Sequence, residues 1–269
     1  MADFDFISSP GDIRNLLDEQ VVRINRPEFI DDDPVQFPRR FSDIRDIETA
    51  AFLSAIIAWG NRKMICRDAD RMLALMSNEP YAFIADKAYE ELPDELNIHR
   101  TFFARDLKYF LRGLNQVYSR YGSLDELAAS AGASESEAPA WTFAEALQKA
   151  LAEANGGRLN SQCVPTKLDT TALKRINMAL RWLVRDDGIV DLGVWESIPK
   201  DKLFVPLDVH VGNTARDLGL ITRRSNDRRA VEQLMVPLRT WRPDDPAIYD
   251  FALFGIGAIL KKQQNQVEL

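Results

Sequence analysis

Residues 174–182 read KRINMALRW, and residues 205–211 read VPLDVHV. Around the first stretch, apolar side chains recur at spacings of three and four, which is typical of an amphipathic helix, and the basic residues fall mostly on the opposite side. The second stretch places Asp208 directly before another helical pattern, where an aspartate commonly accepts hydrogen bonds from the first free amides of a helix. The sequence therefore predicts two helices in the C-terminal half, with Lys174 on the first and Asp208 at the start of the second.

The rest of the chain carries the same helical signal and no sustained alternation of apolar and polar residues. Residues 47–59 (IETAAFLSAIIAW) are apolar on nearly every side, so we expect a buried central helix that stops at Gly60, with Asn61 capping the next helix. Residues 128–140 are small and polar and are expected to form a surface loop or a mobile connection. The predicted fold class is all-α. The expected helices are Ile13–Arg23, Asp46–Trp59, Arg62–Met76, Pro80–Tyr89, Arg100–Tyr121, Trp141–Ala154, Leu168–Arg185, Val209–Leu218, Arg228–Val236 and Pro246–Lys261.

Composition is that of a globular protein. The 269 residues are 46% hydrophobic and 28% charged, which suits one large domain or two small ones with a sizeable core. No stretch of about 18 apolar residues occurs, so no membrane span is expected. The N-terminus, Met1 to Asp5, is acidic and lacks the basic start and apolar core of a signal peptide. We therefore expect a cytoplasmic protein with no membrane partner.

Cysteine and histidine are too few for most metal sites. The chain has two cysteines, Cys66 and Cys163, and two histidines, His99 and His210. Their number excludes a disulfide framework and a four-cysteine iron–sulfur cluster. Closed zinc sites are usually rich in Cys and His at short spacings, and no such spacing occurs. The expectation is a protein with neither a metal nor another cofactor.

Positive charge is concentrated in the C-terminal half. The net charge of −7 argues against a protein whose whole surface is basic and binds nucleic acid. The distribution of the charged residues along the chain matters more than the net charge, however. Residues 216–242 hold seven arginines against three acidic residues, a balance of 7 − 3 = +4, and residues 174–185 hold four basic residues and no acidic ones. A polyanion is therefore expected to bind this half. Arg223, Arg224 and Arg228 are either phosphate contacts or ordinary surface charges.

These two stretches resemble a known family. Residues 206–211 (PLDVHV), followed by a helix that ends in Leu-Gly, resemble the aspartate signature of the helix-hairpin-helix DNA glycosylases, and Lys174 lies 208 − 174 = 34 residues upstream. That wide spacing and the Lys-x-x-Asn-Met pattern are similar to the archaeal 8-oxoguanine glycosylase branch of the superfamily. Over most of its length the chain also resembles a bacterial family of unknown function.

The resemblance implies a two-lobed helical fold of the glycosylase type, with the cleft between the lobes. Residues 1–269 would form a single unit with the lobe boundary near residues 155–167, and the N-terminal segment would pack on either lobe. The implied function is a DNA glycosylase, with or without lyase activity, that removes a damaged purine such as 8-oxoguanine. Carried over by position, Lys174 would be the nucleophile and Asp208 the catalytic carboxylate.

The chemistry explains why such a pair is needed. Cleavage of an N-glycosidic bond develops positive charge on the sugar, which a nearby carboxylate stabilises, and a neutral amine can then add to C1′. A lysine is protonated in water, so partial burial and the neighbouring Arg175 would have to lower its pKa. The base must also leave the duplex for a pocket, for which Trp59, Trp182, His210 and Phe251 are candidate walls.

The chain departs from the superfamily at the hairpin turn, which usually reads Leu-Pro-Gly-x-Gly and holds a DNA phosphate with its backbone amides. Residues 163–169 here read CVPTKLD and contain no glycine. Lys167 and the start of the following helix are candidate replacements for this phosphate contact, and Arg175 and Arg181 are further candidates for binding nucleic acid.

Each candidate also has a structural interpretation, and two other functions stay open. Asp208 is a good helix cap whether or not it acts in catalysis, and Lys174 can belong to a solvated basic face. His210 is more often a packing residue than a base, and tryptophans most often belong to a core. A non-catalytic nucleic-acid or nucleotide binding protein would keep the cleft, but Lys174 would be held by a hydrogen bond or the space beside it would be filled by other side chains. A helical interaction protein would have no pocket near Asp208. No feature of the sequence specifies an oligomeric state.

Overall fold

The computed structural model describes residues 10–257, most of which are helical. The only sheet among them is an antiparallel pair of short strands, β1 (Asn97–His99) and β2 (Phe102–Phe103). This confirms the all-α fold class. None of the described helices is both long and apolar enough to cross a bilayer. The α-helices are α1 (Pro10–Ile24), α2 (Glu28–Asp31), α3 (Ile44–Ile56), α4 (Arg62–Leu75), α5 (Pro80–Ala85), α6 (Ala104–Tyr121), α7 (Leu124–Ser130), α8 (Pro139–Ala154), α9 (Lys174–Val184), α10 (Val209–Asp217) and α11 (Arg228–Trp241).

Six short 3-10 helices and one further helical stretch complete the described elements. Residues 249–257 are helical, and the predicted end of this helix at Lys261 lies outside the described residues. The 3-10 helices are η1 (Pro34–Gln36), η2 (Pro38–Arg40), η3 (Ala88–Glu91), η4 (Leu168–Thr170), η5 (Lys200–Lys202) and η6 (Pro246–Ile248).

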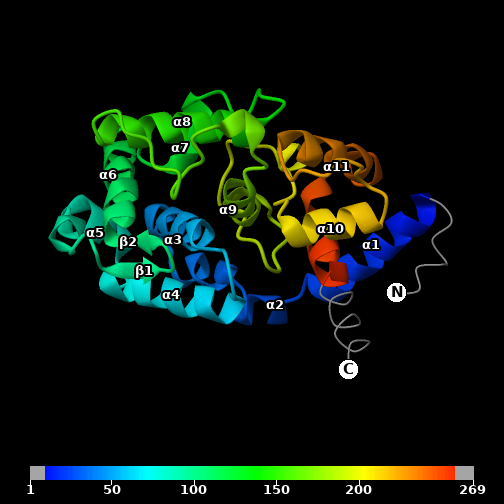
Figure 1. Ribbon diagram of the computed structural model, residues 1–269, viewed down its shortest axis with the longest axis horizontal. Helices are drawn as coiled ribbons and strands as arrows, with labels where there is room; N and C mark the ends of the chain where they lie inside the picture. The colour runs from blue at the N-terminus through cyan, green and yellow to red at the C-terminus, as the bar shows by residue number, and fades with distance from the viewer. Residues whose placement is uncertain (1–9, 258–269) are drawn as a thin grey trace.

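The helices form two groups on either side of α9 (Figure 1). Helices α3 to α8 lie on one side, and α1, α10 and α11 lie on the other, with α2 in the connection that runs beneath them. Helix α9 packs against α3 and α8. The N-terminal helix lies with the C-terminal group, where Asp18 accepts hydrogen bonds from Arg242 (3.3 Å) and Tyr249 (3.0 Å).

Helix α3 is the centre of the first group. Its residues from Ile47 to Ile56 are all buried, as the continuous apolar pattern predicts. The helix ends at Ile56, short of the predicted Trp59, so that residues 57–60 form a turn into α4. Asn61 caps α4 as predicted, accepting hydrogen bonds from the amides of residues 63 and 64. The end of α3 at Ile56 and the cap of α4 at Asn61 therefore place Trp59 in the short turn between these two helices.

Helix α9 starts later than the periodicity predicts. The expected helix runs from Leu168 to Arg185, but the structure has a 3-10 turn first and begins α9 at Lys174. The break lies at Leu173, whose backbone adopts a left-handed conformation (φ +49°) that cannot continue a right-handed helix. The prediction of one continuous helix is wrong, and Lys174 occupies the first turn of α9.

The start of α6 is also different from the prediction. A helix is expected from Arg100, but β1 and β2 form their hairpin there, and α6 begins at Ala104. Arg100 itself has a left-handed backbone (φ +50°) in the tight turn between the two strands. The hairpin was missed because its strands are too short for alternation to be visible.

Two buried arginines, Arg181 of α9 and Arg185 directly after it, tie this helix to later parts of the chain. Arg181 pairs with Asp191 and Asp250, and Arg185 pairs with Asp191 and Asp245. The two arginines are 4% and 0% exposed, so their charges depend on these partners rather than on water. The prediction that the basic residues of this helix form a solvated face is wrong for both.

Glu48 is a buried carboxylate of α3 that caps a different helix. Its two oxygens accept hydrogen bonds from the backbone amides of Leu124 (2.8 Å) and Asp125 (3.0 Å) at the start of α7. Burial raises the pKa of Glu48 from 4.5 to about 8, and the two amide hydrogen bonds, which favour the charged form, only partly oppose this rise.

Glu48 should make stability depend on pH. The folded state holds this proton more tightly than the unfolded chain, so stability should fall as the pH rises from about 4.5 to about 8 and change little above that. Glu48→Gln carries no titrating charge, so its free energy of unfolding should improve relative to wild type by on the order of 5 kcal/mol across this window. Urea titrations at a series of pH values measure the difference. A difference that stays constant with pH would contradict the assignment.

Candidate active site

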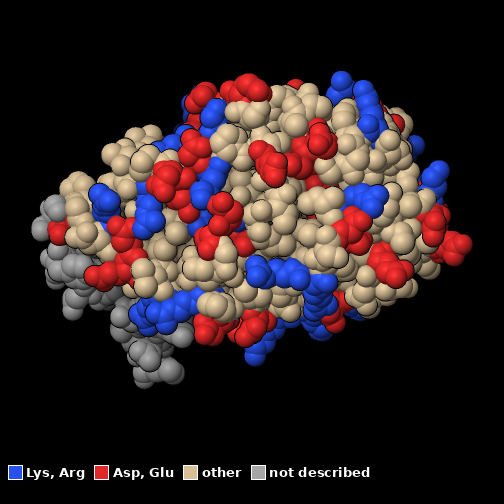
Figure 2. Space-filling model, turned by 180° about the vertical axis from the view of Figure 1, so that it is seen from behind, with Lys and Arg blue, Asp and Glu red and all other residues tan. Residues whose placement is uncertain are grey.

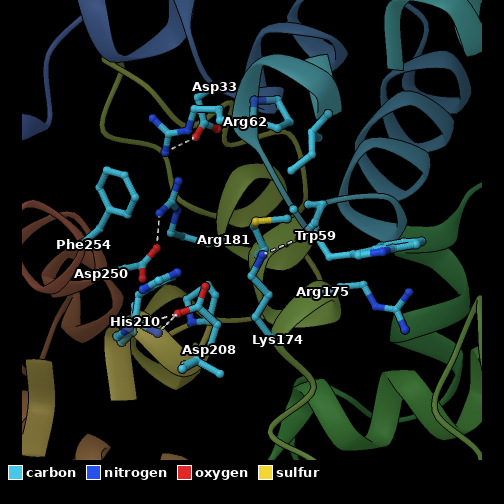
Figure 3. Close-up of a pocket in the computed structure, with 18 of the residues that line it drawn as sticks. Asp33, Trp59, Arg62, Lys174, Arg175, Arg181, Asp208, His210, Asp250 and Phe254 are labelled. Carbon is cyan, nitrogen blue, oxygen red and sulfur yellow. Dashed lines mark hydrogen bonds and ion pairs between the residues drawn. The ribbon is translucent and has the colours of Figure 1, made fainter. Parts of the chain in front are cut away.

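A large cavity lies beside α9, and residues of both helical groups line it. Its volume of about 930 Å³ lies at the upper end of the range of about 300–1,000 Å³ that is usual for small-molecule sites. Three segments contribute most of the lining: the first turns of α9, the turn after α3, and the start of α10 with the residues before it. We call this space the central cavity; Figure 3 shows the side chains around it.

Lys174 is the first residue of α9 and points into the central cavity (Figure 3). Its Nζ atom donates a hydrogen bond to the backbone carbonyl of Ala58 at 3.2 Å. Burial lowers the pKa of the amine, and Arg175 adds to this, while the carboxylates of Asp208 and Asp250 oppose it. The positive end of the α9 dipole also disfavours a charge at this position. Lys174 is therefore neutral, and able to act as a nucleophile, more often than a surface lysine.

Asp208 caps α10 and also lines the central cavity. Its Oδ1 atom accepts hydrogen bonds from the amides of His210 and Val211, both at 2.9 Å, which confirms the capping interpretation. No hydrogen bond to Oδ2 is formed within residues 10–257. The backbone carbonyl of Asp208 accepts from Asn226 at 3.0 Å. A Cβ atom at Gly212 would lie 2.5 Å from that asparagine side chain, so glycine permits this contact.

The structure thus brings together two groups that are 208 − 174 = 34 residues apart. Lys174 and Asp208 line the same cavity, and the carboxylate raises the pKa of the amine that burial lowers. In such an arrangement a neutral amine can attack an electron-poor carbon, and a fixed carboxylate can stabilise the positive charge that develops there.

Asp250 is a cavity residue that the sequence analysis misses. It is 7% exposed, and its carboxylate has one hydrogen-bond partner among the described residues, Arg181. Burial raises the pKa of Asp250 to about 6, and the carboxylate of Asp208 adds to the rise, while Arg181 opposes it. The available signal is a single acidic residue within the apolar run that contains Phe251.

Asp33 and Arg62 complete the charged lining of the cavity. Arg62, from α4, pairs with Asp33 at 3.1 Å. Its guanidinium also lies 4.5 Å from the ring centroid of Phe254, which belongs to the helix over residues 249–257. This contact links the two helical groups, and no short-range pattern in the sequence indicates it.

Arg175 and Arg181, which the sequence places among the nucleic-acid contacts, bind groups of the protein itself. Arg175 donates to the carbonyls of Ile56 (3.0 Å) and Gln162 (2.6 Å), and so joins the connection after α8 to the end of α3. Arg181 is 4% exposed and pairs with Asp250 at the cavity wall. Both guanidiniums therefore line the central cavity with their donors bound to groups of the protein, and neither is a free charge on the surface.

The other proposed phosphate contacts lie away from the central cavity lining. Arg223 and Arg228 are half-buried and pair with acidic neighbours, whereas Lys167 and Arg224 are exposed. Lys167 and Arg228 line a second, open cavity of about 610 Å³ together with Trp141. Figure 2 shows basic and acidic side chains interspersed over one face of the molecule.

The four candidate base-pocket residues all line the central cavity. Trp182 and Phe251 are fully buried and form its inner wall, Trp59 is half-buried, and His210 is exposed. Packing thus gathers three aromatic side chains from three separate segments around one space.

A buried histidine supports Trp59. The Nδ1 atom of His99 lies 2.7 Å from a carboxylate oxygen of Asp68, and its Nε2 atom lies 3.0 Å from the carbonyl oxygen of Trp59. The two rings meet edge to face, with their centroids 4.9 Å apart. This contact holds the wall residue at a fixed position, because the histidine is itself fully buried.

Comparison with known proteins assigns a family. The family model described as a protein of unknown function, DUF2400, matches residues 33–259. The chain belongs to the DUF2400 family. The matched range contains Lys174, Asp208 and Asp250 and every lining residue of the central cavity except Phe29. No curated protein and no solved structure matches the chain.

Proposed function

We propose that this DUF2400 protein is a DNA glycosylase with lyase activity that removes a damaged purine such as 8-oxoguanine. One observation carries the proposal: the Lys174 amine, whose pKa is lowered, and the Asp208 carboxylate line the same cavity. The aromatic walls support it, because a flipped base is commonly held by stacking on such rings. The cavity volume of about 930 Å³ leaves room for a base and its sugar.

The two-lobed glycosylase type of fold is part of the same proposal. It is supported by the two helical groups on either side of α9 and by a cavity that both groups line. It is also supported by Asp208, which caps a helix at the cavity wall. The exposed Lys167, after α8, is retained as a candidate phosphate contact in place of the glycine-rich turn.

The proposed reaction uses only side chains of this chain and water. As the bond between C1′ and the base breaks, its electron pair leaves with the base, and Asp208 stabilises the positive charge on the sugar. The neutral Lys174 amine forms a bond to C1′, and the base takes up a proton. The nitrogen then loses a proton, and the ring oxygen O4′ takes one up as the C1′–O4′ bond breaks, which gives a protonated Schiff base. Removal of a C2′ proton then expels the 3′ phosphate and cleaves the strand.

Borohydride trapping tests this proposal. Borohydride reduces a Schiff base to a stable amine, so wild type should become covalently attached to labelled duplexes that carry 8-oxoguanine or an abasic site. Lys174→Ala should abolish the adduct, because the attacking amine is gone. Lys149→Ala removes an exposed lysine of α8 that does not line the central cavity, so it is the matched control and should still form the adduct. An adduct that survives Lys174→Ala, or a folded wild type that neither traps DNA nor releases a base, would reject the proposal.

The hydrogen bond from Lys174 to the carbonyl of Ala58 favours a second candidate, a nucleic-acid or nucleotide binding protein without catalysis. An amine that donates to a backbone carbonyl is held away from a free attacking position. In this case DNA carrying a damaged base should bind, with no adduct and no base release from wild type. Trapping and binding measured on the same duplexes separate the two candidates.

A further inference from the structure

Asp250 faces the space in which the proposed function places the base (Figure 3). It lies near the start of the helix over residues 249–257, directly before the buried ring of Phe251. The Arg181 guanidinium lies 4.3 Å from the centroid of that ring and also binds Asp250 and Asp191. The Asp250 carboxylate is therefore held in one orientation by a buried network, with an aromatic surface beside it.

The free part of this carboxylate can only accept hydrogen bonds while it is ionised. A carboxylate offers about four lone-pair sites on its two oxygens, and Arg181 is its one partner among the described residues. Its pKa of about 6 leaves it mostly ionised at neutral pH. A ligand that enters the central cavity therefore meets a fixed acceptor that needs donors.

Purine bases differ in the hydrogen-bond donors that they present on their Watson–Crick edge. A guanine-derived base presents two adjacent donors on its Watson–Crick edge, the N1–H group and the 2-amino group. Adenine presents an acceptor beside a donor, and hypoxanthine lacks the 2-amino group. A buried charged acceptor that is left without a donor loses solvation and gains nothing in return, so the site discriminates strongly against the wrong edge.

We propose that Asp250 is the specificity-determining residue of the central cavity and that its carboxylate selects guanine-derived bases by accepting from N1–H and the 2-amino group. This inference rests on the proposed function, and it narrows the substrate class of that site. Asp250 recognises the base and not the sugar, so an abasic site should be processed without its help.

Matched substrates test the inference. One duplex carries 8-oxoguanine, a second carries 8-oxohypoxanthine, which lacks only the 2-amino group, and a third carries an abasic site. Wild type should release 8-oxoguanine at least about tenfold faster than 8-oxohypoxanthine, because the second base lacks one of the two donors to the carboxylate. Asp250→Asn, which offers one acceptor and one donor, should bring this ratio close to one. Trapping at the abasic site should stay within about twofold of wild type, because no base is read there.

Asp245→Asn controls for the buried ion network. Asp245 pairs with Arg185 in that network but does not line the central cavity, so its variant should keep the wild-type substrate ratio. If both variants lose the ratio equally, the effect comes from the network and the inference is rejected. A wild type that releases both bases at the same measurable rate also rejects it.

Equilibrium binding separates this inference from the proposed function. Fluorescence anisotropy on the same two base-containing duplexes reports recognition without any reaction. If wild type traps no DNA but binds the 2-amino base more tightly, and Asp250→Asn removes that preference, the glycosylase proposal fails and the role of Asp250 stands. If trapping succeeds and neither assay shows a preference, the proposed function stands and Asp250 does not read the base.

Discussion

Asp208→Asn is expected to lower the single-turnover rate of base release by about 10²- to 10³-fold, the loss that follows removal of one preorganised electrostatic group. The carboxylate is positioned by α10, whose amides at residues 210 and 211 bind its Oδ1 atom. An asparagine can accept the same two hydrogen bonds but carries no charge to stabilise the sugar cation. Caps of asparagine and aspartate are about equally effective, so the protein should stay folded with almost unchanged stability.

A second cap serves as the matched control for this prediction. Asp227 caps α11 in the same manner, accepting from the amide of Ala230, and lies outside the central cavity. Asp227→Asn should therefore leave base release unchanged. If Asp208→Asn reacts at the wild-type rate while its melting temperature also stays constant, the carboxylate is only a cap and the proposed mechanism is wrong.

Asp191→Ala is expected to destabilise the fold by about 3–5 kcal/mol, because removal of one partner from a buried ion pair leaves its counterpart charged and unsolvated. Asp191 is 2% exposed and contacts Arg181 and Arg185 at once. Without it, Arg181 keeps Asp250 and Arg185 keeps Asp245, but each loses a charge-assisted hydrogen bond inside the protein. Urea denaturation followed by circular dichroism measures the change in the free energy of unfolding.

The neighbouring surface pair provides the comparison. Asp186 pairs with Lys200, and its side chain is 65% exposed. Asp186→Ala should cost no more than about 1 kcal/mol, since solvent already screens this pair. If the two aspartates prove equally dispensable, the buried network does not stabilise α9, and the fixed orientation of Asp250 would need another cause.

Several parts of the fold could be predicted because they depend on neighbours within one or two helical turns. The continuous apolar run of residues 47–59 predicts a buried helix, and α3 is buried from Ile47 to Ile56. Asn61 and Asp208 are recognisable as caps because their hydrogen bonds reach amides only two or three residues away. Trp59, Trp182 and Phe251 could be proposed as walls of a base pocket because they are aromatic. Helical periodicity could not show that they line the same cavity.

The parts that could not be predicted depend on groups far apart in the chain. Helical periodicity continues through Leu173, yet a left-handed residue there moves Lys174 into a first turn at the cavity wall. Basic residues on α9 match a solvated face by pattern, but segments some 60 residues later supply carboxylates that make burial of Arg181 and Arg185 possible.

The sequence by itself therefore determined the helical class and the principal caps, which follow from local backbone hydrogen bonding and side-chain periodicity. The choice of Lys174 and Asp208 as a pair came from the resemblance to the glycosylases. Only the tertiary structure decided that Lys174 is half-buried at the wall of a cavity, that Arg181 faces inward, and that Asp250 joins Asp208 in that cavity. Desolvation and charge pairing arise when distant segments pack together and exclude water, so no short stretch of sequence contains them.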